Sequence, residues 1–281
     1  MIVVPGSASL SLARSLADTL DVPLADVENR RFPDGECYVR LLSSLDGEDA
    51  IVVNRAYPDE KIVETLLLQD AVREAGAKRI TTVLSYMGYS RQDKLFNPGE
   101  AISARAMARM FSLYSDAVVT VDIHDRGILR WFDVPVEDVS GMPALAEKLE
   151  TMGVEIVLSP DKGALHRART VGEMLAVPWD HLEKTRLDGE HVVIKPKDLN
   201  VKGKIVAIVD DMISTGGTVV TAAGQLRDQG ARRIIAACTH GLFVGNALER
   251  VRRACDAVIS TDTIENPTTS VTVAREIAGV L

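Results

Sequence analysis

The sequence predicts an α/β fold built as two tandem domains, each a mainly parallel sheet flanked by helices. Two observations carry this prediction. Short apolar runs rich in Val and Ile alternate with segments of helical periodicity, which is the order of βαβ units. The same order of segments then occurs a second time, and 281 residues suffice for two domains of ordinary size. We expect one domain over residues 1–141, a second over 142–267, and a C-terminal helix over 268–281.

An internal repeat supports the two-domain prediction. Residues 12–24 match residues 167–179 at a spacing of 155, and five of these thirteen positions are identical. Three further blocks follow: 51–52 with 205–206 and 71–83 with 225–237 at a spacing of 154, and 116–119 with 256–259 at a spacing of 140. The smaller last spacing indicates that the first half carries about fourteen additional residues, which we place between residues 86 and 104.

The elements of each half follow from local patterns and turn residues. In the first half, apolar runs predict strands at 1–4, 50–54, 79–85 and 117–121, and amphipathic segments predict helices at 11–20, 62–75 and 102–113. Residues 29–39 are strand-like on either side of a turn-rich segment, 32–36. The second half repeats this order with strands at 156–158, 192–195 and 205–209 and a helix at 219–229.

The most informative stretch is the segment from Ile205 to Thr218. It begins as a buried-type strand, continues with two carboxylates, Asp210 and Asp211, and then enters a short loop before a helix. The loop residues are hydroxyl-bearing side chains or glycines: Ser214, Thr215, Gly216, Gly217 and Thr218. Unpaired amides at the start of the following helix suit a phosphate, and glycines permit its close approach.

The two carboxylates would repel that phosphate, so they suit neutral hydroxyls or a cation beside it. The segment therefore predicts a sugar-phosphate site at the carboxyl end of a strand, where ligands of open α/β sheets bind. An ordinary strand end with an acidic turn is the alternative. A Walker phosphate loop and a Gly-x-Gly-x-x-Gly motif are both absent from the sequence. The first half has Arg55 and Ala56 at the position of the acid pair, so we expect only the second half to keep the site.

Four other segments could carry chemistry. The loop 86–94 brings Arg and Lys after a strand, which suits a polyphosphate, although a solvated charged loop is the simpler explanation of this stretch taken alone. Residues 32–36 offer an aromatic ring and two carboxylates for a base, or form a hairpin tip. His124 lies between carboxylates at a strand end and could bind a metal or be structural. Residues 159–163 supply Asp161 and Lys162 for cation and phosphate contact.

Composition limits the partners. The net charge is −8 and the pI is near 5.2, which argues against general nucleic-acid binding. The three cysteines form no CxxC pair or disulfide framework, and the first residues do not resemble a signal peptide. No apolar stretch approaches the length of a membrane span. We therefore expect a cytoplasmic protein that does not associate with membranes.

Taken in order, these motifs resemble a known family. The segment 205–218 resembles the phosphoribosyl-diphosphate (PRPP) loop of the type I phosphoribosyltransferase fold. Five motifs together resemble ribose-phosphate diphosphokinases, also called PRPP synthetases: Phe-x-Asp-Gly-Glu, Gly-Tyr-x-Arg-Gln-Asp-Lys, Asp-x-His, Ser-Pro-Asp-x-Gly and Val-Asp-Asp-x-x-Ser-Thr-Gly-Gly-Thr. The chain is shorter than bacterial members and looks more like archaeal ones. It departs from the bacterial pattern at residues 95–100 and at Ser214, where many bacterial members have Asp.

The resemblance implies roles for particular residues. ATP would lie between the domains and contact Phe32, Asp34, Glu36, Arg91, Gln92, Asp93 and His124, the first three reaching it from a neighbouring subunit of at least a homodimer. His124 and Asp161 would serve Mg²⁺. Asp210 and Asp211 would take the ribose hydroxyls of ribose 5-phosphate, and Ser214, Thr215, Gly216, Gly217 and Thr218 its phosphate. Lys184 and Arg186, in the charged segment 181–189, match the catalytic pair. The family's C-terminal tail returns to the first domain.

The resemblance implies transfer of the β,γ-diphosphoryl group of ATP to the C1 hydroxyl of ribose 5-phosphate, which yields PRPP and AMP. A non-catalytic regulatory homologue that binds PRPP or nucleotide is the alternative. A pure binder has no need of His124, Asp161, Lys184 and Arg186 together. A base phosphoribosyltransferase is disfavoured, because those enzymes usually need a single such domain and a hood.

Overall fold

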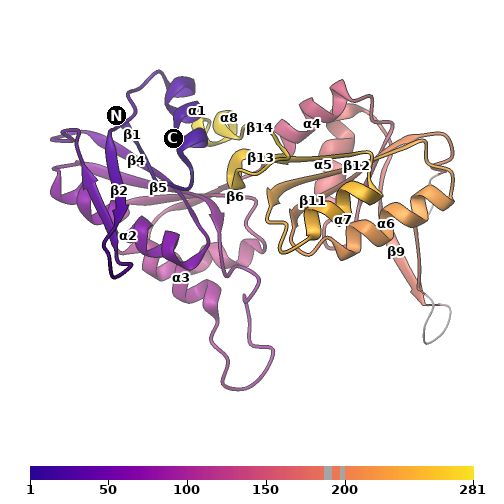
Figure 1. Ribbon diagram of the computed structural model, residues 1–281, viewed down its shortest axis with the longest axis horizontal. Coiled ribbons are helices and arrows are strands. Elements are labelled where there is room, and N and C mark those ends of the chain that lie inside the picture. Colours follow the sequence, from indigo (N-terminus) through magenta and orange to yellow (C-terminus); the bar gives the residue numbers. More distant parts are fainter. Residues whose placement is uncertain (187–191, 197–199) are drawn as a thin grey trace. The chain divides into compact units, whose positions relative to one another are not determined.

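The computed structural model describes residues 1–186, 192–196 and 200–281. The chain divides into two units (Figure 1), which are described separately below. The first unit comprises residues 1–140, 263–265 and 272–281, and the second comprises residues 141–262 and 266–271. Within the described residues, no helix is both long enough and apolar enough to cross a membrane.

The first unit is built on a five-stranded parallel sheet in the order β1-β4-β5-β6-β7. Its strands are β1 (Ile2–Pro5), β4 (Asp49–Ala56), β5 (Arg79–Met87), β6 (Ala117–Val121) and β7 (Val136–Val139). The helices are α1 (Leu10–Leu20), α2 (Asp59–Glu74), α3 (Ser103–Ser112), the short α8 (Ala274–Ala278) and a 3-10 turn at Arg126–Trp131. A separate antiparallel hairpin joins β2 (Val27–Arg31) to β3 (Cys37–Leu41).

Alternate residues of the central strands point to opposite faces of this sheet, as strand geometry requires. Val3, Ile51 and Val53 pack with α1 and α8, whereas Val4 and Val52 pack with α2 and the hairpin. Both layers are aliphatic and almost fully buried, as the low aromatic content indicates. The sheet is therefore covered on both sides, which explains why its strands are continuously apolar.

The second unit has a seven-stranded sheet in the order β10-β9-β8-β11-β12-β13-β14, parallel except for the β9–β10 pair. Its strands are β8 (Ile156–Ser159), β9 (Trp179–Arg186), β10 (Val192–Pro196), β11 (Ile205–Ile213), β12 (Arg233–Gly241), β13 (Ala257–Thr261) and β14 (Thr269–Val271). Helices α4 (Met142–Thr151) and α5 (Leu165–Leu175) cover one face, and α6 (Gly217–Asp228) and α7 (Ala247–Ala254) cover the other. A 3-10 turn at Asp262–Ile264 follows β13.

The segment expected as one helix, residues 268–281, differs from that expectation. Thr269–Val271 form β14 at the edge of the second sheet, and only Ala274–Ala278 are helical. The run Thr269-Ser270-Val271-Thr272-Val273 explains the difference, because β-branched side chains favour extended backbone. The short helix α8 buries Ala274 and Ile277 against α1 in the first unit.

One hydrogen-bonded arrangement occurs in both units at corresponding positions. In the first unit, Arg73 Nη2 lies 2.8 Å from Asp116 Oδ2, which also accepts from the N–H of Ile80 at 2.7 Å. In the second, Arg227 Nη2 lies 2.8 Å from Asp256 Oδ2, which accepts from the N–H of Ile234 at 2.8 Å. The internal repeat deduced from the sequence is thus also present in these hydrogen bonds.

Strand pairing changes one detail of the repeat. Asp49 pairs with Arg79 in the first sheet, and Ile205 pairs with Arg233 in the second. Since Arg79 and Arg233 correspond, Asp49 corresponds to Ile205, at a spacing of 156 rather than 154. By this register the counterparts of Asp210 and Asp211 are Asn54 and Arg55, whereas the expected Arg55 and Ala56 correspond to a spacing of 155.

Candidate active site

The acid pair of the second unit lies within β11 rather than after it. The strand extends to Ile213, four residues beyond the expected end, and Asp210 is paired with Cys238 of β12. The longer strand follows from its pairing with β12, which continues to Gly241 and so supplies partners for Met212 and Ile213. Asp210 is half-buried and Asp211 is 4% exposed, so the two carboxylates lie at the carboxyl end of the sheet with little water around them.

A buried cation accompanies the acid pair. Arg167 of α5 is 8% exposed, and its Nη2 lies 3.4 Å from Oδ2 of Asp211. A buried carboxylate is costly unless it is paired, and this guanidinium supplies the compensating charge. The corresponding residue of the first unit is Leu12, which is fully buried in the apolar core. The first unit therefore lacks the cation as well as the two carboxylates.

The Asp210 carboxyl group keeps its proton to a higher pH than an ordinary aspartate, because its pKa is raised. Burial, followed by the neighbouring Asp211, raises the pKa of Asp210 to about 8, although Arg167 acts in the opposite direction. The backbone N–H of Asp211 donates to Oδ1 of Asp210 at 2.9 Å. A ligand that donates hydrogen bonds to this oxygen, such as a sugar hydroxyl, would favour its ionised form.

The loop after β11 supplies the residues expected to bind a phosphate. Gly216 has a φ of +74°, a left-handed backbone conformation that other residues rarely adopt, and α6 begins at the next residue. Thr215 and Thr218 are exposed, and Ser214 and Gly217 are half-buried. The first amides of α6 have no partner within the helix, so this loop joins accessible hydroxyls to N–H groups that suit an anion.

In the first unit, the region that corresponds to the loop between β11 and α6 is filled by the chain itself. Its helix α2 begins at Asp59, four residues before the counterpart of Gly217, so a turn of helix replaces the glycine loop. Glu64, the counterpart of Thr218, is 3% exposed and accepts from the N–H and Oγ of Ser7 and from Nζ of Lys61, at 2.6, 2.7 and 2.8 Å. The position that could hold a phosphate is thus filled by a carboxylate of the chain itself.

Three of the residues that were expected to contact ATP lie at the tip of the β2–β3 hairpin. Phe32 is 38% exposed, and its ring meets that of Tyr38 edge-on at 5.5 Å between centroids. Oδ1 of Asp34 accepts from the N–H of Glu36 at 3.1 Å, which closes the turn. The tip therefore presents one aromatic ring and two exposed carboxylates to the surroundings of the first unit.

The loop after β5 carries Arg91, Gln92 and Asp93. Its conformation is set by Glu100, which accepts from the N–H groups of Phe96 and Asn97, the Asn97 amide and the Gln92 amide. These hydrogen bonds lower the pKa of Glu100 to about 2. Arg91 is exposed, whereas Gln92 and Asp93 are half-buried. Glu100, which the sequence analysis did not single out, thus orders the loop that was expected to contact ATP.

The two residues expected to serve a metal belong to different units. His124 is exposed after β6, next to Ile123, whose N–H donates to Asp138 at 2.9 Å. Asp161 is exposed after β8 and accepts from the N–H of Ala164 at 3.1 Å. Within the described part of the chain, no three His, Cys, Asp or Glu side chains form a metal-binding group. Mg²⁺ often binds through one or two carboxylates together with substrate phosphates, so an exposed Asp161 fits such an ion.

Lys184 and Arg186, the expected catalytic pair, lie in β9 and not in a turn. Lys184 pairs with Ile194 and Arg186 with Val192 of β10. The β-branched run Val192-Val193-Ile194 favours this extended pairing. The side chains of both residues lie outside the described part of the chain, as does the remainder of the expected loop, residues 187–189.

Comparison with known proteins identifies the family. Residues 1–114 match the family model described as the N-terminal domain of ribose phosphate pyrophosphokinase, and residues 190–277 match that of the phosphoribosyl synthetase-associated domain. A Methanopyrus kandleri protein named ribose-phosphate pyrophosphokinase is 47% identical over 284 residues, covering 99% of this chain and 97% of the relative. The chain belongs to the ribose-phosphate pyrophosphokinase family.

One further relative and one solved structure agree with this assignment. The Halobacterium salinarum protein of that name is 40% identical and aligns over 99% of this chain and all of its own length. The crystal structure of phosphoribosylpyrophosphate synthetase from Mycobacterium smegmatis superposes with a TM-score of 0.86 at 32% identity, covering 99% of this chain and 96% of that one. The family, its resemblance to archaeal members and the α/β fold predicted from the sequence are confirmed.

Within this ribose-phosphate pyrophosphokinase, the structure brings the acid pair and the glycine loop together in one unit, as predicted. Sequence reasoning missed Arg167, although it lies in the repeat block 167–179. Its signal was the substitution of a buried Leu12 by a charged residue at the corresponding position, since a charge at a core position requires a partner.

Proposed function

We propose that this chain is an active ribose-phosphate pyrophosphokinase, which transfers the β,γ-diphosphoryl group of ATP to the C1 hydroxyl of ribose 5-phosphate. The observation that carries the proposal is the acid pair on β11, buried beside Arg167 and followed directly by the glycine loop and α6. The carboxylates can accept hydrogen bonds from sugar hydroxyls, and the amides of the adjacent loop and helix can bind a phosphate. The two groups therefore match the two ends of a sugar phosphate.

In this proposal Asp210 and Asp211 accept hydrogen bonds from the ribose hydroxyls. The backbone and hydroxyls of residues 214–218 hold the 5-phosphate. The adenine is held by Phe32, Asp34 and Glu36, and the phosphates and sugar of ATP by Arg91, Gln92, Asp93 and His124. These contacts fix the anomeric hydroxyl and the β-phosphorus relative to each other, which supplies much of the catalysis in phosphoryl transfer.

The anomeric oxygen forms a bond to the β-phosphorus of ATP while the bond between that phosphorus and the α,β-bridging oxygen breaks. AMP leaves with the bridging oxygen, and the hydroxyl proton passes to solvent. Lys184 and Arg186 stabilise the negative charge that develops on the transferred group. Mg²⁺, for which Asp161 and His124 are the proposed residues, would neutralise phosphate charge when bound with ATP.

The experiment that tests this function is an AMP-release assay with purified protein, ATP, Mg²⁺ and ribose 5-phosphate, in which the product is identified by phosphorus NMR. AMP that forms only when the sugar phosphate is present, together with a diphosphate doublet, is the expected result. Omission of Mg²⁺ with EDTA present is expected to abolish AMP formation, and added Mg²⁺ is expected to restore it.

A non-catalytic homologue that binds PRPP or nucleotide is the second candidate. It would give no AMP but would bind PRPP or nucleotide tightly in calorimetry. We further propose that the protein is cytoplasmic, acts without nucleic acid and forms at least a homodimer, because base contacts from the hairpin tip are proposed to come from a neighbouring subunit. Sedimentation of the purified protein as a monomer at assay concentration would contradict the last point.

A further inference from the structure

The loop between β11 and α6 is hydrogen-bonded on one side to the segment that leads from β12 into α7. The carbonyl of Ile213 accepts from the N–H of Phe243 at 3.0 Å, and that of Ser214 accepts from the N–H of Val244 at 3.0 Å. The carbonyl of the next residue, Thr215, accepts from Nη2 of Arg250, in the middle of α7. Three consecutive carbonyls, the last one of β11 and the first two of the loop, are therefore fixed on one side.

This arrangement determines where the loop amides point. In a trans peptide group the C=O and the following N–H point in opposite directions. Because the carbonyls of residues 213–215 are directed toward the β12–α7 segment, the N–H groups of Ser214, Thr215 and Gly216 are directed away from it. Among the residues that the structure describes, these three N–H groups have no hydrogen-bond acceptor. They precede the unpaired first amides of α6, so the two sets together form an anion site.

The packing between loop and helix is close. A Cβ atom added to Gly216 would lie 2.7 Å from Cγ2 of Val251, one residue after Arg250 on α7. Gly216 and Val251 are both buried. The loop therefore cannot move toward α7, and Arg250 fixes the orientation of the one peptide group that the strand and the β12–α7 backbone leave unsupported.

We infer that Arg250 is a positioning residue for ribose 5-phosphate, which acts through the Thr215 carbonyl to keep the loop amides directed at the 5-phosphate. This inference rests on the proposed function. Arg250 touches the loop from the side opposite to the expected ligand, so it contributes to substrate affinity without contacting the substrate.

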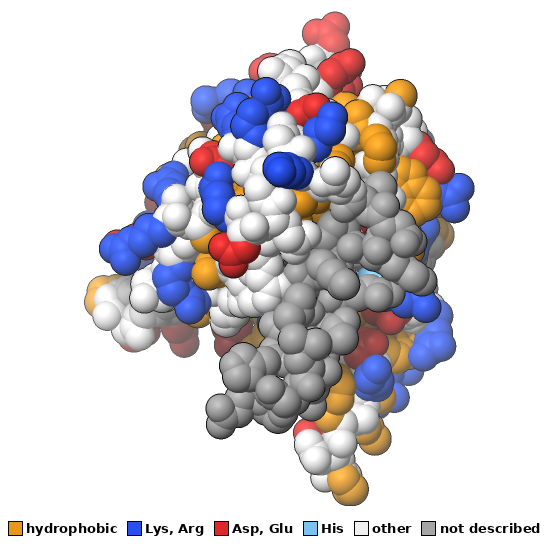
Figure 2. Space-filling view, turned by 90° about the vertical axis from the view of Figure 1, so that its right-hand side faces the viewer, with side chains coloured by type: hydrophobic (Ala, Val, Ile, Leu, Met, Phe, Trp, Pro, Cys, Tyr) orange, Lys and Arg blue, Asp and Glu red, His pale blue; other side chains and the backbone are white. Residues whose placement is uncertain are grey.

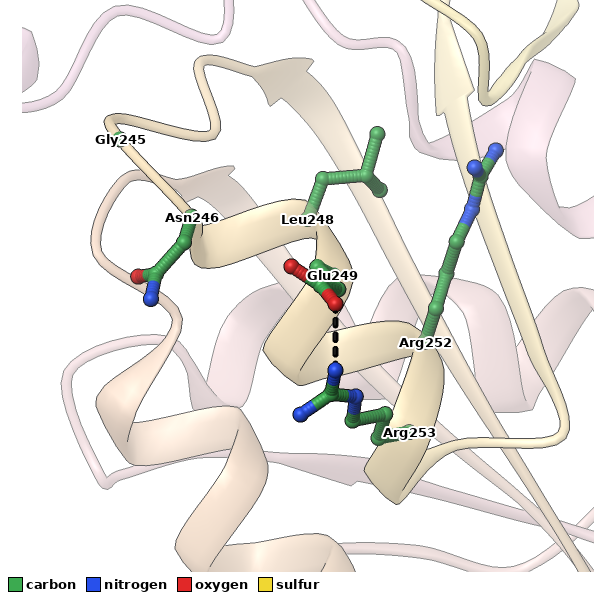
Figure 3. Close-up of a pocket in the computed structure, with 6 residues that line it drawn as sticks. All are labelled: Gly245, Asn246, Leu248, Glu249, Arg252 and Arg253. Atoms are coloured by element: carbon green, nitrogen blue, oxygen red, sulfur yellow. Dashed lines mark hydrogen bonds and ion pairs between the residues drawn. The ribbon is translucent and has the colours of Figure 1, made fainter.

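Other basic residues of α7 do not share this contact, and they provide matched controls. Arg253 pairs with Glu249, and Arg252 donates to the carbonyl of Pro267 at 3.1 Å. Both line an open depression on the outer side of α7 (Figure 3), which also includes Gly245, Asn246 and Leu248. On the surface shown in Figure 2, Lys and Arg side chains lie interspersed with Asp and Glu. Arg253→Ala thus removes the same charge as Arg250→Ala from the same helix.

The test compares Arg250→Ala, Arg250→Lys and Arg253→Ala by calorimetric binding of ribose 5-phosphate, by steady-state kinetics and by thermal unfolding. A hydrogen bond from a charged donor at an exposed site corresponds to about a 10-fold change in affinity. Arg250→Ala is expected to raise the Kd and KM for ribose 5-phosphate by about that factor, with KM for ATP and Tm unchanged. Arg250→Lys, which keeps a charged donor, is expected to recover part of the loss, and Arg253→Ala to resemble the unmodified protein.

If Arg250→Ala and the unmodified protein bind ribose 5-phosphate with equal affinity, the inference is overturned but the proposed function is not. Equal losses in Arg250→Ala and Arg253→Ala would also overturn it, because they would indicate a general effect of charge. Absence of ribose 5-phosphate binding by the unmodified protein would overturn the proposed function as well. If Arg250→Ala fails to fold, the affinity of Arg250→Lys for ribose 5-phosphate is compared with that of Arg253→Ala. Equal affinities of these two variants would then overturn the inference.

Discussion

Arg167 and Asp211 form an ion pair in which both side chains are more than nine-tenths buried, with 3.4 Å between Nη2 and Oδ2. Removal of one partner leaves the other charge buried and uncompensated. Arg167→Leu, which introduces the residue of the first unit, is therefore expected to lower the free energy of unfolding by about 3 kcal/mol. Urea unfolding followed by circular dichroism measures this change.

The double variant Arg167→Leu with Asp211→Asn is the control for that prediction. Because it removes both charges, most of the lost stability is expected to return, while AMP formation stays low because the sugar site has lost a carboxylate. A double variant no more stable than Arg167→Leu would show that the ion pair is not the cause.

The raised pKa of Asp210 predicts how pH affects stability. The folded pKa of about 8 lies above the ordinary value of 3.8, so the folded protein binds more protons than the unfolded chain between these limits. The free energy of unfolding is thus expected to fall as pH rises from about 4 to about 8. The groups around Asp210 are Asp211, Arg167 and Cys238. Asp210→Asn, measured in parallel, is expected to remove this part of the pH dependence.

The same pKa predicts how pH affects substrate affinity. Ribose hydroxyls favour the ionised Asp210, so affinity for ribose 5-phosphate is expected to rise with pH up to about 8 and then to level off. The substrate phosphate also titrates, so the difference between the unmodified protein and Asp210→Asn isolates the contribution of this carboxyl. Identical pH profiles for the two proteins would contradict the assignment of Asp210.

Two adjacent glycines are expected to respond differently to substitution. Gly216→Ala forces a left-handed conformation and a 2.7 Å contact with Val251, so it is expected to lower stability by at least about 1 kcal/mol and to weaken ribose 5-phosphate binding. At Gly217 an added Cβ meets nothing within 4 Å, so Gly217→Ala is expected to leave Tm unchanged. Thermal unfolding of both variants provides the comparison.

The closed region of the first unit predicts the binding stoichiometry. Since Glu64 occupies the counterpart of the phosphate loop, one ribose 5-phosphate is expected to bind per chain. Calorimetric titration measures this number. Asp210→Asn with Asp211→Asn is expected to weaken this binding strongly, and more than one molecule bound per chain of the unmodified protein would place a second site elsewhere.

Substitution of Lys184 or Arg186 by Ala is expected to reduce kcat by about 10³-fold or more, because each loses a charge that stabilises the transferred diphosphoryl group. Binding of ribose 5-phosphate is expected to be retained. Single-turnover AMP release and calorimetry separate the two effects, and a loss of binding in proportion to turnover would argue against a catalytic role.

The parts of the fold that the sequence predicted are those whose cause is local. The alternation of apolar runs and helices, the repeat, and the order of acid pair, glycine loop and α6 could all be read from the sequence. The length of β11 could not, because its last residues are strand only through pairing with β12. Residues 269–271 carry a local signal for extended backbone in their β-branched side chains, but the sequence does not show the edge of the sheet that supplies their pairing partner.

For the supporting residues of the site, the sequence did not show which partners they contact. Arg167 and Arg250 are distant in sequence from the loop and pair that they contact, and an isolated arginine in an amphipathic helix gives no indication of its partner. Glu100 acts through hydrogen bonds within its own loop, which depend on a backbone conformation that the sequence of that loop does not specify.

The core of the first unit also has a consequence for the order in which the protein is made. Val273, Ala274 and Ile277 are fully buried against α1, yet they are synthesised after the entire second unit. While the ribosome translates residues 141–262, the core cluster around α1 lacks Val273, Ala274 and Ile277. The first unit is begun first and completed last, so its core stays without these residues throughout synthesis of the second unit.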